Sequence, residues 1–141
     1  MRSLLHIVIG IFIGILIIKG PDWYHWFVAS NIKVQKIHFD HWDSDLYLKQ
    51  KTWGLTGDKR IISLSTNDKL EVDTTIKNDY SIYGLDHIFY QQYGDTLILY
   101  SSSKFKDPEK FTTPIKVKQV ILDNPAIQDL YRKVGETPSI F

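Results

Sequence analysis

The chain has 141 residues, carries 17 basic and 16 acidic side chains, and contains no cysteine. The lack of cysteine excludes disulfides and thiolate chemistry. Setting Arg2, Lys19 and Asp22 aside leaves 15 basic and 15 acidic residues over residues 31–141. This part of the chain has no net charge to attract a polyanion, so we expect no nucleic-acid partner.

The most apolar stretch, LLHIVIGIFIGILII, covers residues 4–18 and contains neither a formal charge nor a proline. As a helix it would measure roughly 22 Å at ~1.5 Å per residue, against a bilayer core of ~30 Å. Lys19 can extend its amine toward the headgroups, and the aromatic residues 23–27 suit the membrane interface. We therefore expect residues 1–30 to form a membrane anchor with an aromatic collar, contacting the lipid bilayer through residues 4–27.

A cleaved secretory signal is the main alternative to this anchor, and a buried core helix is a third interpretation. Arg2 and the α-amine form a basic start, and residues 28–30 resemble a small-residue cleavage site. That site lies far beyond the apolar run, behind Pro21 and several bulky aromatics. We favour an uncleaved single-pass anchor in the cell membrane, with the N-terminus inside and the C-terminal domain outside the cytoplasm.

Residues 31–141 are expected to form one β-rich domain, because short segments with strand patterns alternate with polar turns. The first segment carries Ile32 and Val34 on one parity but Ile37 and Phe39 on the other, which predicts a bulge near Gln35. The strictest alternation falls in residues 70–76. The expected strands cover residues 32–39, 46–53, 60–66, 70–76, 81–83, 87–92, 96–101 and 115–122.

One helix is predicted near the end of the chain, over residues 124–134. Asn124 can cap it, Pro125 fits the first helical position, and Gly135 can end it. Apolar residues recur there at helical spacing and give the helix one apolar face. The expected fold class is mainly β, with the N-terminal membrane helix followed by a small antiparallel β-sandwich or open barrel with one C-terminal helix.

Two polar clusters have the residue types of reactive sites but lack the spacing of known motifs. His38, Asp40 and His41 are candidate metal ligands at the end of the first strand, with Asp43 and Asp45 nearby. Elsewhere, Asp86 and His87 would need a serine such as Ser63 or one of residues 101–103 to form a hydrolytic set. Neither cluster matches a metal-binding or nucleophile motif, so we predict no catalytic residue, metal site or cofactor.

Tyrosines are the least ordinary feature of the domain, since they concentrate in one part of it. Tyr83, Tyr90, Tyr93 and Tyr100 are candidates for an exposed interaction surface for a glycan, a peptide or an envelope protein. The alternative is that they fill the core, because tyrosine favours strands. The expected function is a non-catalytic binding module in the cell envelope. The alternatives are a small envelope enzyme and a secreted binding module.

Overall fold

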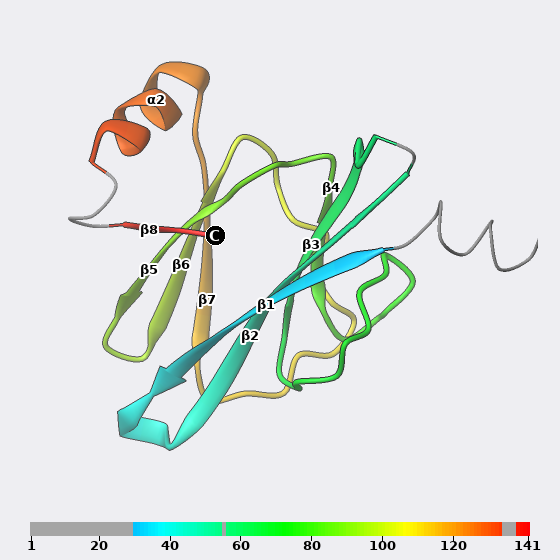
Figure 1. Cartoon of the computed structure of the whole chain (residues 1–141). Coiled ribbons are helices and arrows are strands. Elements are labelled where there is room, and N and C mark those ends of the chain that lie inside the picture. Colours follow the sequence, from blue (N-terminus) through cyan, green and yellow to red (C-terminus); the bar gives the residue numbers. More distant parts are fainter. Residues whose placement is uncertain (1–29, 55, 134–137) are drawn as a thin grey trace, which may run out of the picture.

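The computed structural model describes residues 30–54, 56–133 and 138–141. These residues form a mainly β fold of two four-stranded sheets and one C-terminal helix (Figure 1). The predicted anchor, apart from Ser30, lies outside the described residues, as do Val134 and Gly135. Within the described ranges no helix is long and apolar enough to cross a membrane. The β-rich fold class and the C-terminal helix are confirmed.

The first sheet is an antiparallel meander in the order β1-β2-β3-β4. The short 3-10 helix η1 (Asp40–Trp42) connects its first two strands, and Asp43 then turns the chain with a positive φ of 42°. Aspartate tolerates this left-handed conformation better than most residues. The strands are β1 (Asn31–Phe39), β2 (Ser44–Trp53), β3 (Lys59–Ser65) and β4 (Tyr80–Tyr83).

The second sheet has the order β7-β6-β5-β8 and is mixed. Its strands are β5 (Phe89–Tyr93), β6 (Thr96–Ser101), β7 (Lys116–Ile121) and β8 (Ser139–Ile140). β7 pairs in parallel with β6, so the prediction of a wholly antiparallel fold is wrong. Parallel neighbours need a long crossover. Residues 102–115 supply it by crossing to the first sheet, where Lys106 pairs with Ser81, before returning to the start of β7.

The hydrophobic core lies between the two sheets, as in a β-sandwich. Residues outside the predicted strands complete it, because Phe105 of the crossover and the C-terminal Phe141 are both buried there. Phe141 also exchanges two backbone hydrogen bonds with Ile88, which holds the chain end against β5. The strand side chains of this core are Ile37, Phe39, Leu46, Leu48, Ile62, Leu64, Ile82, Tyr90, Leu97 and Leu99.

Seven of the predicted strands are present, with ends within two residues of their expected positions. The predicted bulge near Gln35 is absent, since β1 pairs with β2 in unbroken register from Asn31 opposite Thr52 to Phe39 opposite Ser44. The change of parity instead places Ile32 and Val34 on the outer face of the sheet. A sheet that is covered on both faces can carry apolar residues on both faces.

The predicted strand at residues 70–76 does not form, and the segment is irregular. Asp73 explains part of this result, because its carboxylate accepts a hydrogen bond from the backbone N–H of Thr75 at 2.9 Å. Such a local bond competes with ladder pairing. Only Val72 of this segment is buried, whereas Leu70 is 66 % exposed. Residues 66–79, which we call the strap, therefore cover the outer face of the first sheet without extending it.

The C-terminal helix α2 (Asn124–Arg132) begins one residue earlier than its predicted cap implies. Asp123, not Asn124, is the N-cap, and its carboxylate accepts a hydrogen bond from the Ala126 N–H at 3.0 Å. This bond satisfies one of the free N–H groups of the first turn. The helix lies on the second sheet, away from the first one (Figure 1).

Candidate functional site

The outer face of the second sheet carries the main cavity of interest. Leu97 and Leu99 of β6 point into the core, so the alternating residues Ile98 and Tyr100 point outward. Phe89 lies opposite Tyr100 and shares this outer face. It is nevertheless only 2 % exposed. The reason is α2, whose Tyr131 packs edge-on against Phe89 with 4.9 Å between ring centroids.

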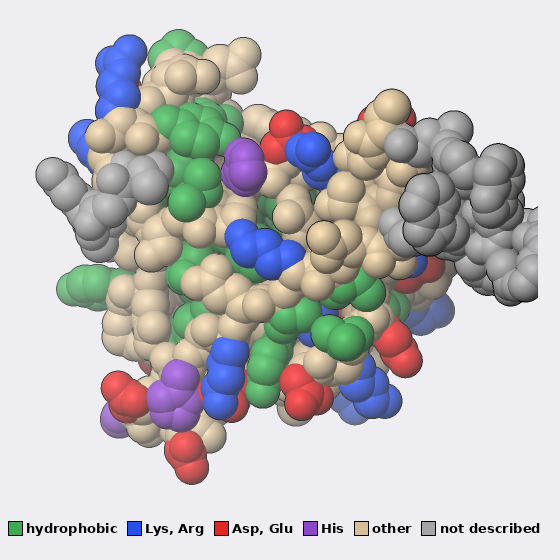
Figure 2. All heavy atoms as spheres, viewed as in Figure 1, with side chains coloured by type: hydrophobic (Ala, Val, Ile, Leu, Met, Phe, Trp, Pro, Cys, Tyr) green, Lys and Arg blue, Asp and Glu red, His purple; other side chains and the backbone are tan. Residues whose placement is uncertain are grey.

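A cavity of about 280 Å³ opens between α2 and this end of the sheet, and we call it the helix pocket. Its apolar and aromatic wall is formed by Leu85, Phe89, Tyr100, Ile127 and Tyr131. Its polar lining comes from Asp86, His87, Ser101, Ser102 and Asn124. Figure 2 shows hydrophobic side chains gathered where the helix meets the body of the protein, with a histidine beside them. Ile127 and Tyr131 reach the pocket together because they are four residues apart on one helix face.

Some polar groups of the helix pocket already have partners. The Asp86 carboxylate pairs with Arg60, and its backbone carbonyl accepts a hydrogen bond from Gln50 at 2.8 Å. The Tyr100 hydroxyl donates to the Gln91 side chain at 3.1 Å. The pocket therefore contains an acidic residue but little unbalanced charge.

Other polar groups of the pocket are available to a ligand. Among the described residues, the side chains of His87, Ser102 and Asn124 have no hydrogen-bond partner. The His87 ring stands edge-on to Tyr131 at 6.4 Å between centroids. The arrangement combines flat apolar walls with donors and acceptors at their edge, which is the common pattern of small-molecule sites.

The hydrolytic set considered from the sequence is only partly assembled. Asp86, His87 and Ser101 do line the same pocket, whereas Ser63 lies in the other sheet. The Ser101 hydroxyl donates to the backbone carbonyl of Ser103 at 2.6 Å. Asp86 is held by Arg60. A catalytic nucleophile needs a neighbouring base, and the base needs a third group that orients it. Of the three side chains, Asp86 and Ser101 are bonded to other groups, whereas His87 has no partner among the described residues.

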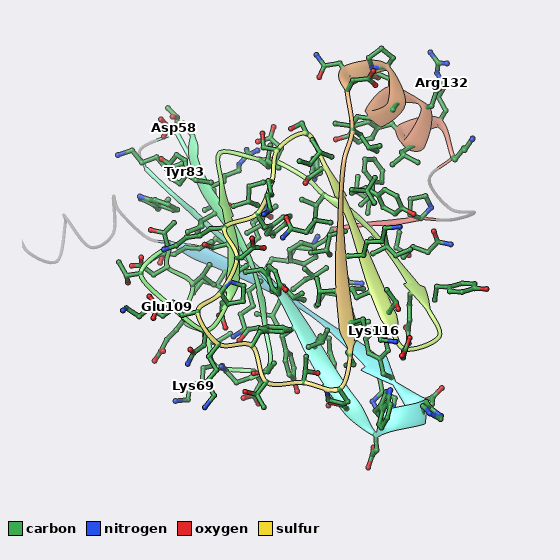
Figure 3. The ribbon with its side chains drawn as sticks, turned by 180° about the vertical axis from the view of Figure 1, so that it is seen from behind. Asp58, Lys69, Tyr83, Glu109, Lys116 and Arg132 are labelled. Atoms are coloured by element: carbon green, nitrogen blue, oxygen red, sulfur yellow. The ribbon has the colours of Figure 1, made fainter. Side chains whose placement is uncertain are left out.

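The four candidate tyrosines do not form one surface. Tyr83 is exposed at the edge of the first sheet and packs edge-on against Trp53, with 6.0 Å between centroids. Tyr90 is buried in the core, where its hydroxyl is hydrogen-bonded to Gln35. Tyr93 and Tyr100 alone share the outer face of the second sheet. Figure 3 shows Tyr83 far from Lys116, which marks the start of β7 on that second sheet.

Two of the candidate metal ligands, His38 and Asp40, belong to a network of polar contacts with Asp45. His38 contacts Asp45 at 2.7 Å through Nδ1 and Asp40 at 3.3 Å through Nε2. Hydrogen bonds from Lys36 and His38 lower the pKa of the Asp45 carboxyl. His41 stacks edge-on against Trp42 at 5.0 Å. In the part of the chain that the structure describes, no three histidine or acidic side chains are grouped to hold a metal ion.

A second polar feature, which the sequence did not indicate, lies under the strap on the first sheet. Lys49 is 1 % exposed, and its ammonium group donates a hydrogen bond to Asn67 of the strap at 3.2 Å. Burial lowers the pKa of Lys49 and raises the pKa of Asp79. Ser63 lies opposite Lys49, and its buried hydroxyl has no partner among the described residues. Lysine and serine at outward positions normally indicate a solvated face, so nothing in the pattern predicted this burial.

A smaller notch of about 120 Å³ opens on the same face, beside Trp53 and Tyr83. Val72 and Ile61 contribute its apolar lining, and Lys51 lies over the Trp53 ring at 5.6 Å. This volume is well below the several hundred Å³ typical of ligand pockets. The helix pocket is therefore the better candidate site.

Comparison with known proteins adds no family to this description. No family model matches the chain, and no curated protein or solved structure shows a significant match.

Proposed function

We propose that this chain is a membrane-tethered, non-catalytic binding module of the cell envelope, and that a glycan end binds in its helix pocket. The observation that carries this proposal is a pocket with aromatic walls and hydrogen-bonding groups that have no partner among the described residues. The apolar segment of residues 4–18 supports the tether. The proposed location is the cell membrane, with the β-rich part outside the cytoplasm.

A sugar ring suits this chemistry because it has both apolar faces and hydroxyl edges. The ring of Tyr131, which is 40 % exposed, offers a flat surface for the C–H face of a sugar ring. His87 and Asn124 can exchange hydrogen bonds with its hydroxyls. The volume of about 280 Å³ lies at the small end of the range for ligand sites, which fits one ring better than a larger ligand.

Binding of N-acetylglucosamine tetrasaccharide to the full chain in phosphatidylcholine nanodiscs tests this proposal by calorimetry. We expect Tyr131→Ala to weaken binding by about tenfold, because a central aromatic wall is lost. The matched control is Tyr83→Ala, which removes an exposed tyrosine from the other sheet and should leave binding unchanged.

The same sample has three informative outcomes. A loss of binding in Tyr83→Ala but not in Tyr131→Ala would move the site to the notch beside Trp53. Absence of measurable binding would contradict a glycan site. An intact mass lacking about 30 N-terminal residues would contradict the uncleaved anchor, since a removed signal peptide has that length.

A further inference from the structure

We propose that the glycan continues from the helix pocket across the open part of the second sheet and carries negative charge there, which makes the ligand an anionic glycan. This inference rests on the proposed function. It concerns the surface formed by Gln91, Tyr93, Thr96, Ile98, Lys116 and Lys118, which we call the open rows.

The strand register makes the open rows a direct continuation of the pocket. Phe89 and Tyr100 form the row beneath α2. The next outward row is Gln91, Ile98 and Lys118, and the last is Tyr93, Thr96 and Lys116. Two residues along a strand span roughly 7 Å, so these rows extend the surface by about 7 and about 13 Å. A short oligosaccharide leaving the pocket would lie along them.

The charges change along this path. In the pocket, Asp86 is balanced by Arg60. In the last row, Lys116 pairs with Asp95 at 3.0 Å. Lys118, in the row between them, is exposed and makes no ion pair with any described residue. The path therefore offers a neutral pocket followed by one uncompensated positive charge, which favours a neutral terminal ring followed by an acidic one.

The distal end of the path carries an aromatic side chain. Tyr93 is 75 % exposed and is absent from the hydrophobic core. Its ring lies on the same face as Tyr100, two rows away. This exposed ring gives a flat stacking surface at the point where the glycan would leave the protein.

A glycan fits the open rows better than an extended peptide does. β6 lies between β5 and β7, and its backbone groups are engaged in both ladders. A peptide recognised as an added strand needs a free sheet edge, which here is the outer edge of β7 and not the face formed by the open rows. Contact with the open rows is made by side chains alone, and their stacking and charge chemistry matches an acidic oligosaccharide.

The test compares two matched probes on the full chain in phosphatidylcholine nanodiscs. The first probe is hyaluronan tetrasaccharide, and the second is the same tetrasaccharide with its carboxylates reduced to alcohols. We expect the acidic form to bind about twofold to fivefold more tightly, because exposed ion pairs contribute modestly. Raising the salt concentration should reduce this preference, since salt screens exposed charges.

Lys118→Gln should abolish the preference for the acidic probe and leave binding of the reduced probe unchanged. Lys110→Gln is the control, because it removes the same charge from the crossover loop, outside the second sheet. A preference that survives in Lys118→Gln, or disappears equally in Lys110→Gln, would overturn the inference.

The failures of the two proposals are distinguishable. Equal binding of both probes would overturn the anionic ligand and keep the glycan pocket. Binding of neither probe would overturn both proposals. Vesicles of phosphatidylcholine with phosphatidylglycerol are the third probe. If binding of these vesicles depends on Lys118 while binding of the oligosaccharides does not, the partner is a lipid surface and the inference is wrong.

Discussion

The two sheets are covered on their outer faces in different ways. The strap seals the first sheet so closely that Lys49 is 1 % exposed and Asp79 3 %. α2 covers the second sheet loosely, since no residue of the helix is buried and the helix pocket remains open beneath it. A tight cover over polar side chains contributes to stability, whereas a loose cover over aromatic side chains leaves space for a ligand.

The attachments of the two covers explain this difference. The strap inserts Val72, bonds Asn67 to Lys49, and is held from the crossover loop by Lys106, which donates to the Thr74 carbonyl at 3.3 Å. α2 is connected to the sheet beside it by a backbone bond from Leu122 to Ser101 at 2.9 Å and by ring packing of Tyr131. We therefore expect stability to depend on the strap and ligand binding on the helix.

The largest expected effect on stability comes from the apolar contact of the strap. Val72→Ala removes two methyl groups that are buried against the first sheet, and we expect it to lower the free energy of unfolding by about 2 kcal/mol. Urea unfolding of the full chain in detergent measures this change. Leu70→Ala is the control, because Leu70 belongs to the same segment but is exposed. Equal effects from both variants would mean that the strap does not pack as a structural cover.

A smaller effect of opposite sign is expected at Ser63. Its buried hydroxyl has no partner among the described residues, and leaving such a group unpaired is unfavourable. Ser63→Ala should therefore raise the free energy of unfolding by about 1 kcal/mol. Ser65→Ala provides the matched comparison, since Ser65 is equally buried on the same strand but accepts a hydrogen bond from the Asn67 N–H at 3.3 Å.

The two serine variants should move in opposite directions in urea unfolding. Loss of the bonded hydroxyl of Ser65 should destabilise the protein, because its partner then remains unpaired. A destabilised Ser63→Ala variant would show that a buried water bonds this hydroxyl.

Sequence periodicity predicted the strands well because it reflects the burial of one face. The segment of residues 96–101 was located to the residue, since it is rich in β-branched and aromatic residues and directly follows the turn Tyr93-Gly94-Asp95. Alternation alone failed for residues 70–76. Their alternation is the strictest in the chain, but β4 occupies the edge of β3, and the Asp73 carboxylate bonds the backbone N–H of Thr75 instead. The alternation of apolar and polar residues does not show which strand edges are free to pair.

The candidate site was less predictable because three separate parts of the chain form it. The sequence suggested Asp86 and His87, Tyr100, and the apolar face of the helix as separate features. Their convergence depends on α2 folding back over Phe89, which follows from the crossover that places β7 beside β6. The parallel pairing of these strands was the one topological step that local patterns did not contain.

The smallest expected effect is a pH dependence that separates the buried carboxyl of Asp79 from the half-buried carboxyl of Asp95. Burial raises the pKa of Asp79 above its usual 3.8, so the folded protein holds this proton more tightly than the unfolded chain. The stability that Asp79 contributes is therefore fully present below pH 3.8 and is lost as pH rises through the raised pKa. Relative to Asp79→Asn, the wild-type free energy of unfolding should fall over this range.

At Asp95, hydrogen bonds from Lys116 and Thr96 lower the pKa of the carboxyl. Relative to Asp95→Asn, the wild-type free energy of unfolding should therefore fall as pH drops below 3.8. Urea unfolding at a series of pH values measures both differences. Slopes of the same sign would show that water reaches Asp79, and the contrast between a sealed and an open outer face would then fail.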